Sequence, residues 1–333
     1  MTALKLAEQG CQVTVVERNI IAAQTSGESS WAGAGILFPL LPWFYKDEVN
    51  ALALAGANLY PALCQRLLDE TGIDPEYTVS GMLIQAPFDA ALAESWCAKN
   101  NIQTQYIGDN LLLPQVAQVR NPRLMQALKQ LLIQQNVSML EQTQLEPLAK
   151  VDKIDGWRAN IHAGSGDAKM KVLEADAFVV TSGAWSFELL KETAAGLNIK
   201  PMRGQILLYK LENGQAPQNS MRHIVYRDGF YMVPRRDGYL LAGSTLEDVG
   251  FDPRTTEEVK IELQAKAEAI MPSLKHAPII KHWSGLRPGT PDNLPTIARH
   301  PTIENLYVNT GHFRYGLTMA PASAERVTEL VCT

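Results

Sequence analysis

Hydrophobic positions at the start of the chain change from helical spacing to an unbroken apolar run. Residues 2–9 have helix-forming side chains, and Gly10 is a common helix end signal. The apolar run 11–16 then predicts a buried strand, which ends at Glu17. A helix, a strand and a terminal acid in this order are typical of the second half of a βαβ unit.

Helical spacing returns several times further along the chain. A long helical pattern covers about residues 46–70, with Pro61 as a predicted kink and Gly72 as the end signal. The pair Asn121–Pro122 is a good helix start, and leucines repeat on one face after it. Further helices are expected near Trp185, over 256–271 and over about 322–331.

Short apolar or alternating runs predict strands between these helices. Residues 145–161 indicate a small meander with a turn at Asp155–Gly156, and residues 224–241 indicate antiparallel strands with a hairpin turn at 236–238. Residues 177–181 and 306–309 are typical of buried strands, and glycine-containing loops follow both of them.

Parallel-type strands at both ends of the chain and antiparallel strands between them indicate an α/β fold with two interleaved domains. We expect residues 1–75, 138–200 and 288–333 to form a Rossmann-like dinucleotide-binding domain. We expect residues 76–137 and 201–287 to form an α+β substrate domain on an antiparallel sheet.

Composition narrows the functional classes. The 333 residues are 46% apolar, carry a net charge of -5 and contain no basic block, so nucleic acid is not an expected partner. No run approaches the roughly 20 apolar residues of a membrane span, and no secretory signal is visible, so we expect a cytoplasmic protein. The four cysteines have no metal-ligand or disulfide-framework spacing, which predicts incidental or buried thiols and no metal site.

The βαβ unit predicted around Glu17 is incomplete in the sequence. The acid after the second strand usually binds ribose hydroxyls, about 20 residues beyond a glycine-rich turn that cradles the pyrophosphate. Counting back from Glu17 passes beyond Met1, so the first strand and its glycine turn are not in the sequence. Either the start is assigned too late or a variant has lost the strand, and the chain as given should be fragile.

Four motifs in order along the chain carry a family resemblance. They are Ser29–Leu37, Asp228–Arg235, Gly243–Asp248, and the pair Gly285–Asp292 and Thr310–Gly316. Over essentially the whole chain they resemble the glycine oxidases of the FAD-dependent D-amino-acid oxidase (DAO) family. The resemblance implies non-covalent FAD, oxidation of glycine, sarcosine or D-alanine by molecular oxygen, and imine or 2-oxo acid, ammonia and hydrogen peroxide as products. In many bacteria it also implies the supply of an imine for the thiazole of thiamine.

Carried onto this sequence, the resemblance assigns the FAD contacts to several separate segments. Glu17 would hold the adenosine ribose, and the backbone of Leu148 would contact the adenine. The other positions would line the diphosphate and the ring: Ser29, Ser30, Ala34, Gly35, Ile36, Gly183, His312, Phe313, Arg314, Tyr315, Gly316, Leu317 and Thr318. Backbone N–H groups of the loop 312–318 would stabilise negative charge on the reduced ring. Tyr315 departs from the more usual asparagine, a change that would reshape the loop.

The chemistry of amino-acid oxidation points to three side chains. A substrate amino acid must present its α-hydrogen to the flavin, and a planar guanidinium is a natural bidentate clamp for its carboxylate. Arg287 is the expected clamp, Arg314 would add a hydrogen bond, and Tyr231 would offer a phenolic donor. No protein base is expected if the amine enters neutral, because the flavin accepts a hydride.

Other interpretations remain open. A D-amino-acid dehydrogenase would pass its electrons to an acceptor other than oxygen. A sarcosine-type oxidase with covalent flavin would need a cysteine beside the ring, and the only late cysteine, Cys332, lies well past the loop. A cofactor-free remnant would act as a binding protein, because the pyrophosphate cradle is absent. A homo-oligomer is also possible.

Overall fold

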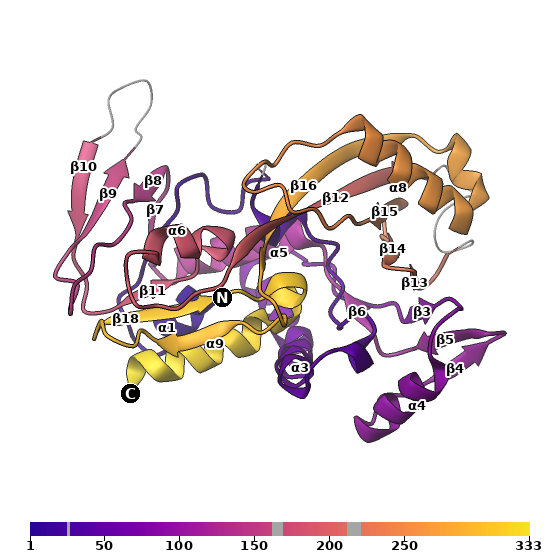
Figure 1. Cartoon of the computed structure of the whole chain (residues 1–333), viewed down its shortest axis with the longest axis horizontal. Helices are drawn as coiled ribbons and strands as arrows, with labels where there is room; N and C mark the ends of the chain where they lie inside the picture. The colour runs from indigo at the N-terminus through magenta and orange to yellow at the C-terminus, as the bar shows by residue number, and fades with distance from the viewer. Residues whose placement is uncertain (25–26, 162–168, 212–220) are drawn as a thin grey trace.

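The computed structural model describes residues 1–24, 27–161, 169–211 and 221–333. Figure 1 shows two regions side by side. One holds both chain ends, several helices and short strands, and the other is built around a large twisted sheet.

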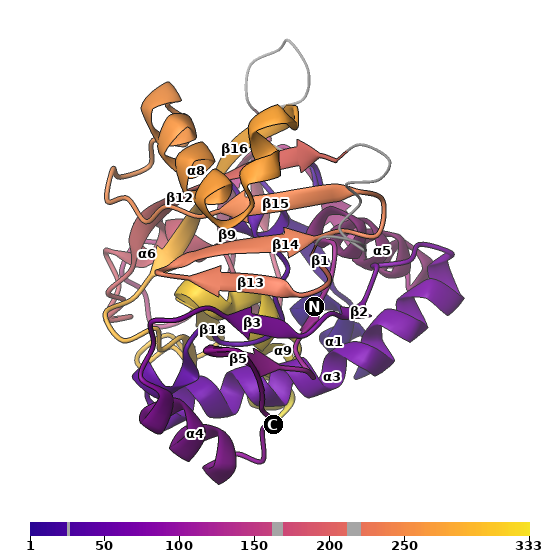
Figure 2. The same ribbon diagram turned by 90° about the vertical axis from the view of Figure 1, so that its right-hand side faces the viewer.

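The large sheet has eight strands in the order β16–β12–β15–β14–β13–β3–β5–β4. All neighbours are antiparallel except β13 and β3. Helix α8 (Glu257–Ile270) and the 3-10 turn η3 (Pro272–His276) cover one face (Figure 2), where Leu207, Leu240 and Leu263 are buried together. The strands are β3 (Met82–Ile84), β4 (Gln105–Ile107), β5 (Asn110–Leu113), β12 (Lys200–Lys210), β13 (Ile224–Arg227), β14 (Phe230–Pro234), β15 (Tyr239–Gly243) and β16 (Ile279–Gly289).

Parallel strands lie in two smaller sheets near the chain ends. Strand β1 (Thr14–Val16) pairs with β7 (Ser138–Leu140), and β11 (Phe178–Val180) pairs with β18 (Leu306–Thr310). Strand β17 (Thr296–Arg299) adds an antiparallel edge to β18. Within the described part of the chain, β1 and β11 each have one strand neighbour. The loops after β1, β11 and β18 leave from carboxyl ends of parallel strands, where ligands bind in open α/β sheets.

Two antiparallel sheets complete the set of strands. One has the order β10–β9–β8 and contains β8 (Thr143–Leu145), β9 (Trp157–Ile161) and β10 (Lys169–Leu173). The other pairs β2 (Thr78–Val79) with β6 (Ala117–Gln118).

The helices pack mainly around the parallel strands. The longest, α3 and α9, cross so closely at Gly56 that a Cβ there would lie 2.1 Å from the carbonyl oxygen of Thr318. These two helices are Asp47–Thr71 (α3) and Gly316–Cys332 (α9). The shorter helices are α1 (Thr2–Glu8), α2 (Ser29–Ala32), α4 (Ala90–Lys99), α5 (Asn121–Gln134), α6 (Ser186–Leu190), and the 3-10 turns η1 (Pro42–Phe44), η2 (Gly183–Trp185) and η4 (Phe313–Tyr315).

Most of the predicted elements are confirmed, but the buried strand predicted over 11–16 is shorter, Thr14–Val16, and none of its three residues is buried. Helix α3 ends where Gly72 takes a left-handed conformation, and α5 begins at Asn121. The meander predicted over 145–161 is wrong in detail, because residues 146–156 form no strand and Asp155–Gly156 directly precede β9. The last helix begins at Gly316, six residues before its predicted start at 322.

The early start of α9 is surprising because Pro321 lies inside the helix. Proline has no N–H to donate to the carbonyl four residues earlier, which here belongs to Leu317. The hydroxyl of Tyr60, a fully buried residue of α3, donates to that carbonyl at 2.5 Å. A tertiary hydrogen bond therefore replaces the missing helical one, which sequence periodicity could not reveal.

Replacing Tyr60 with phenylalanine should lower the free energy of unfolding by about 1–3 kcal/mol, because the Leu317 carbonyl would stay buried without its partner. Urea denaturation followed by circular dichroism measures the change. Tyr209 supplies the matched control, since it is equally buried but its hydroxyl has no hydrogen-bond partner among the described residues. Tyr209→Phe should be neutral or stabilising, and equal losses in the two variants would contradict the role of Tyr60.

Candidate active site

Hydroxyl groups connect the loops that follow the parallel neighbours β11 and β18. The Ser186 hydroxyl lies 3.1 Å from that of Ser182 and 2.8 Å from that of Thr310. Thr310 also donates to the carbonyl of Gly183 at 3.1 Å. Gly183 has a positive φ of 56°, and a Cβ added there would meet no atom within 4 Å. The two loops are thus fixed to each other, with open space beside Gly183.

The loop that begins with α2 is held by the rest of the protein through its carbonyls. Thr318 of α9 donates from its hydroxyl to the Ile36 carbonyl at 3.1 Å. Gly35 has a φ of 76°, and a Cβ there would lie 1.9 Å from the Val119 carbonyl, so only glycine fits. The side-chain hydroxyls of Ser29 and Ser30, in contrast, make no hydrogen bond within the described residues.

Two buried polar residues that hold this loop were not predicted as site residues. Arg235 donates 2.8 Å hydrogen bonds to the carbonyls of Ala34 and Val119. Burial lowers its pKa to about 10, so it stays charged at neutral pH. Asn121 donates to the Ser30 carbonyl at 2.9 Å, and its own side-chain oxygen is buried without a partner among the described residues. Arg235 closes the family motif Asp228–Arg235, but that motif gave it no role, and the only signal for Asn121 was its place before a proline.

Glu17 and Leu148 follow two different strands, β1 and β8. Glu17 directly follows β1, and its carboxylate accepts a hydrogen bond from the backbone N–H of Asn19 at 2.9 Å. The next residue, Arg18, lies over the Trp185 ring at 3.7 Å, which brings the end of β1 towards the loop after β11. The backbone N–H of buried Leu148 donates to the Leu189 carbonyl. The predicted contact between the Leu148 backbone and the adenine ring would therefore use the Leu148 carbonyl.

The loop after β18 turns sharply into α9. His312 lies 2.8 Å from the Ser323 hydroxyl, and burial lowers its pKa to about 4, so the imidazole is neutral at physiological pH. Tyr315 is buried against Tyr45, with ring centroids 5.1 Å apart, and donates to the Leu40 carbonyl at 3.2 Å. Phe313 and Gly316 continue the turn, while Leu317 and Thr318 face α3 and the loop after α2.

Arg287 on β16 occupies a slot that the neighbouring strand leaves open. A Cβ at Gly204 of β12 would lie 2.1 Å from the Arg287 Nη1 atom, so the guanidinium lies flat over the glycine backbone. The guanidinium donates to the Thr245 carbonyl at 3.1 Å and to the Ser244 hydroxyl at 2.7 Å. No carboxylate pairs with it among the described residues. It is therefore a half-buried cation with neutral partners.

An ion pair behind this slot fixes the segment that Arg287 contacts. Arg203 is buried and donates to the Glu247 carboxylate at 2.5 and 3.1 Å. Glu247 also accepts from the side chain of Gln205, and the backbone N–H of Gln205 donates to the Thr245 hydroxyl at 2.9 Å. Hydrogen bonds from Arg203 and its neighbours keep the Glu247 pKa below its ordinary value although burial opposes the shift.

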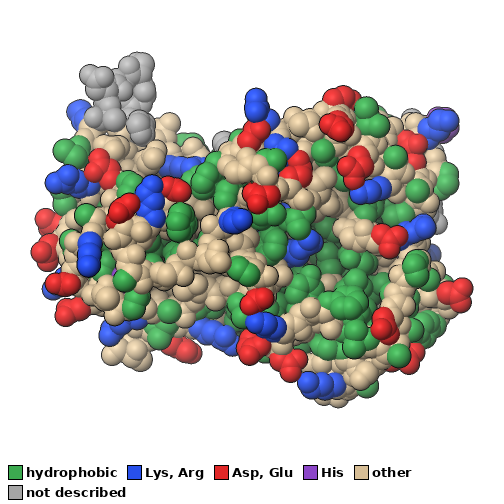
Figure 3. All heavy atoms as spheres, in the orientation of Figure 1, with side chains coloured by type: hydrophobic (Ala, Val, Ile, Leu, Met, Phe, Trp, Pro, Cys, Tyr) green, Lys and Arg blue, Asp and Glu red, His purple; other side chains and the backbone are tan. Residues whose placement is uncertain are grey.

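The three predicted substrate residues lie close enough to influence one another. Burial lowers the pKa of Arg287, the Tyr231 hydroxyl opposes this shift, and the charge of Arg314 lowers the pKa further. Tyr231 is buried on β14, whereas Arg314 is exposed in η4, directly before α9. Figure 3 shows hydrophobic side chains gathered in a hollow between the large sheet and the α4 region, with cationic side chains at its margin.

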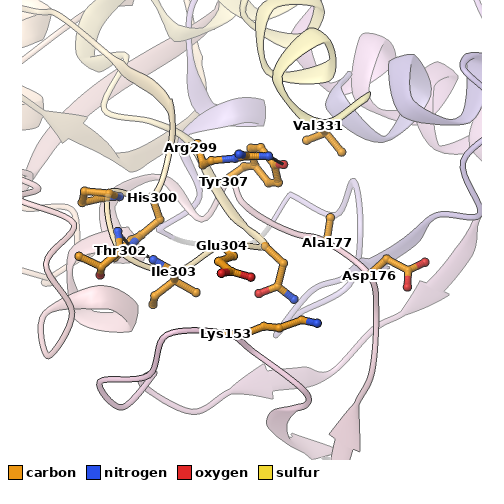
Figure 4. Close-up of a pocket in the computed structure, with 12 residues that line it drawn as sticks. Lys153, Asp176, Ala177, Arg299, His300, Thr302, Ile303, Glu304, Tyr307 and Val331 are labelled. Atoms are coloured by element: carbon orange, nitrogen blue, oxygen red, sulfur yellow. Dashed lines mark hydrogen bonds between the residues drawn. The ribbon is translucent and has the colours of Figure 1, made fainter. Parts of the chain in front are cut away.

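A separate cavity of about 650 Å³ lies elsewhere (Figure 4). Asp176 and Asn305, at the amino ends of β11 and β18, line it together with Arg299 and His300. The loops of the candidate site follow the opposite, carboxyl ends of these strands, and none of the predicted site residues lines the cavity. This cavity is therefore not part of the candidate active site.

Two further searches covered only the residues that the structure describes. None of these helices combines the length and apolar character that crossing a bilayer requires. No group of three histidine, cysteine or acidic side chains within the same ranges is arranged to hold a metal ion.

Comparison with known proteins covers nearly the whole chain. A family profile described as FAD dependent oxidoreductase (DAO) matches residues 1–330. Glycine oxidase of Pseudomonas aeruginosa is 38% identical over 99% of this chain and 91% of its own length. A bifunctional ThiO/ThiG protein of Synechocystis is 28% identical over 98% of this chain and 49% of its own length.

Solved structures agree on the fold. A crystal structure of glycine oxidase from Bacillus cereus superimposes with a TM-score of 0.85 at 23% identity, covering 99% of this chain and 91% of that protein. The family match and the relative at 38% identity together establish the assignment. The chain belongs to the DAO family of FAD-dependent oxidoreductases.

Proposed function

We propose that the chain uses FAD to oxidise glycine or a similar small amino acid such as sarcosine or D-alanine, forming an imine that hydrolyses to a 2-oxo acid and ammonia, or methylamine where the substrate is sarcosine. The observation that carries this proposal is the half-buried Arg287 guanidinium, which has hydrogen bonds to Thr245 and Ser244 but no carboxylate partner among the described residues. Such a cation is stabilised when an anionic ligand approaches it.

The residues around the loops fit a bound flavin. Among the described residues, the hydroxyls of Ser29 and Ser30 and the buried side-chain oxygen of Asn121 have no hydrogen-bond partner, and Gly183 faces open space. Ala34, Gly35 and Ile36 would line the ring, as would the loop His312–Thr318, while Glu17 would hold the ribose. When bound, FAD supplies the acceptor for the hydride.

The chain's own residues would bind and orient the substrate. Arg287 would hold the carboxylate through its planar guanidinium, with Tyr231 as a second donor and Arg314 closing the site from the solvent side. Within the described residues, none of these three groups is arranged as a base. A substrate with a neutral amine needs no deprotonation by the protein. His312, at the start of the loop, is neutral and adds no charge near the flavin ring.

Several finer points rest on the family resemblance. We propose molecular oxygen as the acceptor, with hydrogen peroxide as the product, and a role in supplying an imine for the thiazole of thiamine. The competing acceptor, a compound other than oxygen as in a D-amino-acid dehydrogenase, is distinguished by a peroxide assay. A cofactor-free binding protein is not favoured, because the match to FAD-dependent enzymes spans residues 1–330. A homo-oligomer and a cytoplasmic location stay predictions.

The purified protein, loaded with FAD, should show the visible absorbance bands of a flavoprotein and release peroxide with glycine, sarcosine or D-alanine. Absorbance spectra and a peroxidase-coupled assay measure the two properties separately. Flavin binding without peroxide, but with reduction of an artificial dye, would replace the oxidase by a dehydrogenase. A chain that binds no FAD would overturn the proposal.

Replacing Arg287 with alanine should cost about 2–5 kcal/mol of transition-state stabilisation, because the substrate carboxylate would lose its charged partner.

Tyr231→Phe should cost only about 0.5–1.5 kcal/mol, since a neutral hydrogen bond is exchanged for a packed ring. Steady-state kcat/KM of FAD-loaded variants gives both numbers. An unchanged kcat/KM in Arg287→Ala would refute the clamp.

Gly204→Ala should also lower kcat/KM, by an amount equal to about 1–3 kcal/mol of transition-state stabilisation. The reason is that the new methyl group must displace the Arg287 guanidinium from its slot. Steady-state kinetics of the FAD-loaded variant measures the loss.

A double-mutant cycle controls for general damage to the sheet. Adding Gly204→Ala to the Arg287→Ala variant should cause little further loss, since the displaced group is already gone. Additive losses would show that Gly204 acts through the fold and not through Arg287.

A further inference from the structure

Two exposed cysteines from opposite ends of the sequence meet on the surface. Cys11 follows α1 and Cys332 is the last residue of α9, and their Sγ atoms are 4.0 Å apart across 321 positions of sequence. The sequence alone predicted incidental thiols, because separation along the chain hides this contact. Cys64 and Cys97 are instead buried.

The backbone on both sides of this pair is fixed. The N–H of Cys11 donates to the Leu6 carbonyl at 3.1 Å, which closes the end of α1. Thr333 caps α9 beyond Cys332 through its N–H bond to the Glu329 carbonyl at 3.2 Å.

Polar contacts hold the two helices themselves together. Lys5 of α1 forms a 3.1 Å ion pair with Glu325 of α9. Asn309 of β18 bridges the same helices, since it donates to the Thr2 hydroxyl at 3.2 Å and to the Ser323 carbonyl at 3.5 Å. The thiols are therefore kept near each other by the fold and do not meet by chance diffusion.

Little movement separates the two thiols from a bond. A disulfide has an S–S length of about 2.0 Å, so the sulfur atoms must approach by roughly 2 Å. Rotation about χ1 of two exposed side chains supplies a movement of this size without shifting either helix. Cys64 and Cys97 offer no such route, because both are buried and neither is exposed to dissolved peroxide.

We propose that Cys11 and Cys332 form a peroxide-driven disulfide that ties α1 to α9. One thiolate attacks hydrogen peroxide to give a sulfenic acid and hydroxide, and the second thiol displaces water from it to close the S–S bond. Overall, two thiols lose two electrons and two protons, and peroxide is reduced to two molecules of water.

The source of the peroxide is the part that rests on the proposed function. An oxidase that releases peroxide would expose its own surface thiols to it on every turnover, whereas the disulfide itself requires only the geometry of the pair. Closing such a long loop restricts the unfolded chain and stabilises the fold. The bond would therefore join α1 to α9 whenever the enzyme turns over and releases peroxide.

The test uses the FAD-loaded, fully reduced protein. Added hydrogen peroxide should lower the thiol count under denaturing conditions from four to two, with a mass loss of two hydrogens and a peptide linking Cys11 to Cys332. Tm should rise by an amount on the order of 5 °C, and dithiothreitol should reverse it. Cys11→Ser and Cys332→Ser should each abolish the linked peptide and the rise in Tm, and both substitutions are on the surface.

Other outcomes would overturn the proposal. These are oxygen addition to either cysteine in place of linkage, linkage between two chains, or loss of the buried thiols first. A second arm replaces added peroxide with glycine and oxygen, with and without catalase. If glycine and oxygen produce the disulfide and catalase prevents it, the peroxide comes from turnover. If the disulfide forms only with added peroxide, the disulfide proposal stands and the proposed oxidase activity is contradicted.

Discussion

The placement of one guanidinium over one glycine governs the candidate active site. Strands β12 and β16 approach closely at Gly204, and the absence of a side chain there gives Arg287 room to lie flat beside the sheet. Its hydrogen bonds go to a carbonyl and a hydroxyl, so its charge is left for a ligand. Arg203 and Glu247, paired behind the slot, hold the segment that contacts it. Burying a charged group costs free energy unless an opposite charge pairs with it. In the proposed function, the substrate carboxylate supplies that opposite charge to Arg287.

The other half of the site depends on carbonyl groups that are held in place by buried donors. Arg235 and Thr318 bind the loop that follows α2, and hydroxyls of Ser186 and Thr310 connect the loops after β11 and β18. These contacts come from four separate parts of the chain, so the loops are positioned before any ligand arrives. Preorganisation of this kind lowers the entropy that binding must remove.

Much of the fold could be predicted from the sequence, because periodicity and turn residues are local signals. Helix α3, the start of α5 and the hairpin at 236–238 follow from such signals. The start of α9 did not, since a hydrogen bond from Tyr60 satisfies the carbonyl that Pro321 leaves free. For the site, arginine chemistry and the family motifs pointed to Arg287 and Arg314. Gly204, Arg235 and the contact between Cys11 and Cys332 arise from long-range packing, which one sequence does not display.

The most direct measurement is a crystal structure of the FAD-loaded protein with glycolate, in which a hydroxyl replaces the amine of glycine and the carboxylate is kept. The carboxylate should lie within hydrogen-bond distance of Arg287 and Tyr231, with its α-carbon facing the flavin ring. A glycolate bound away from Arg287, or an Arg287 side chain turned out of its slot over Gly204, would contradict the account.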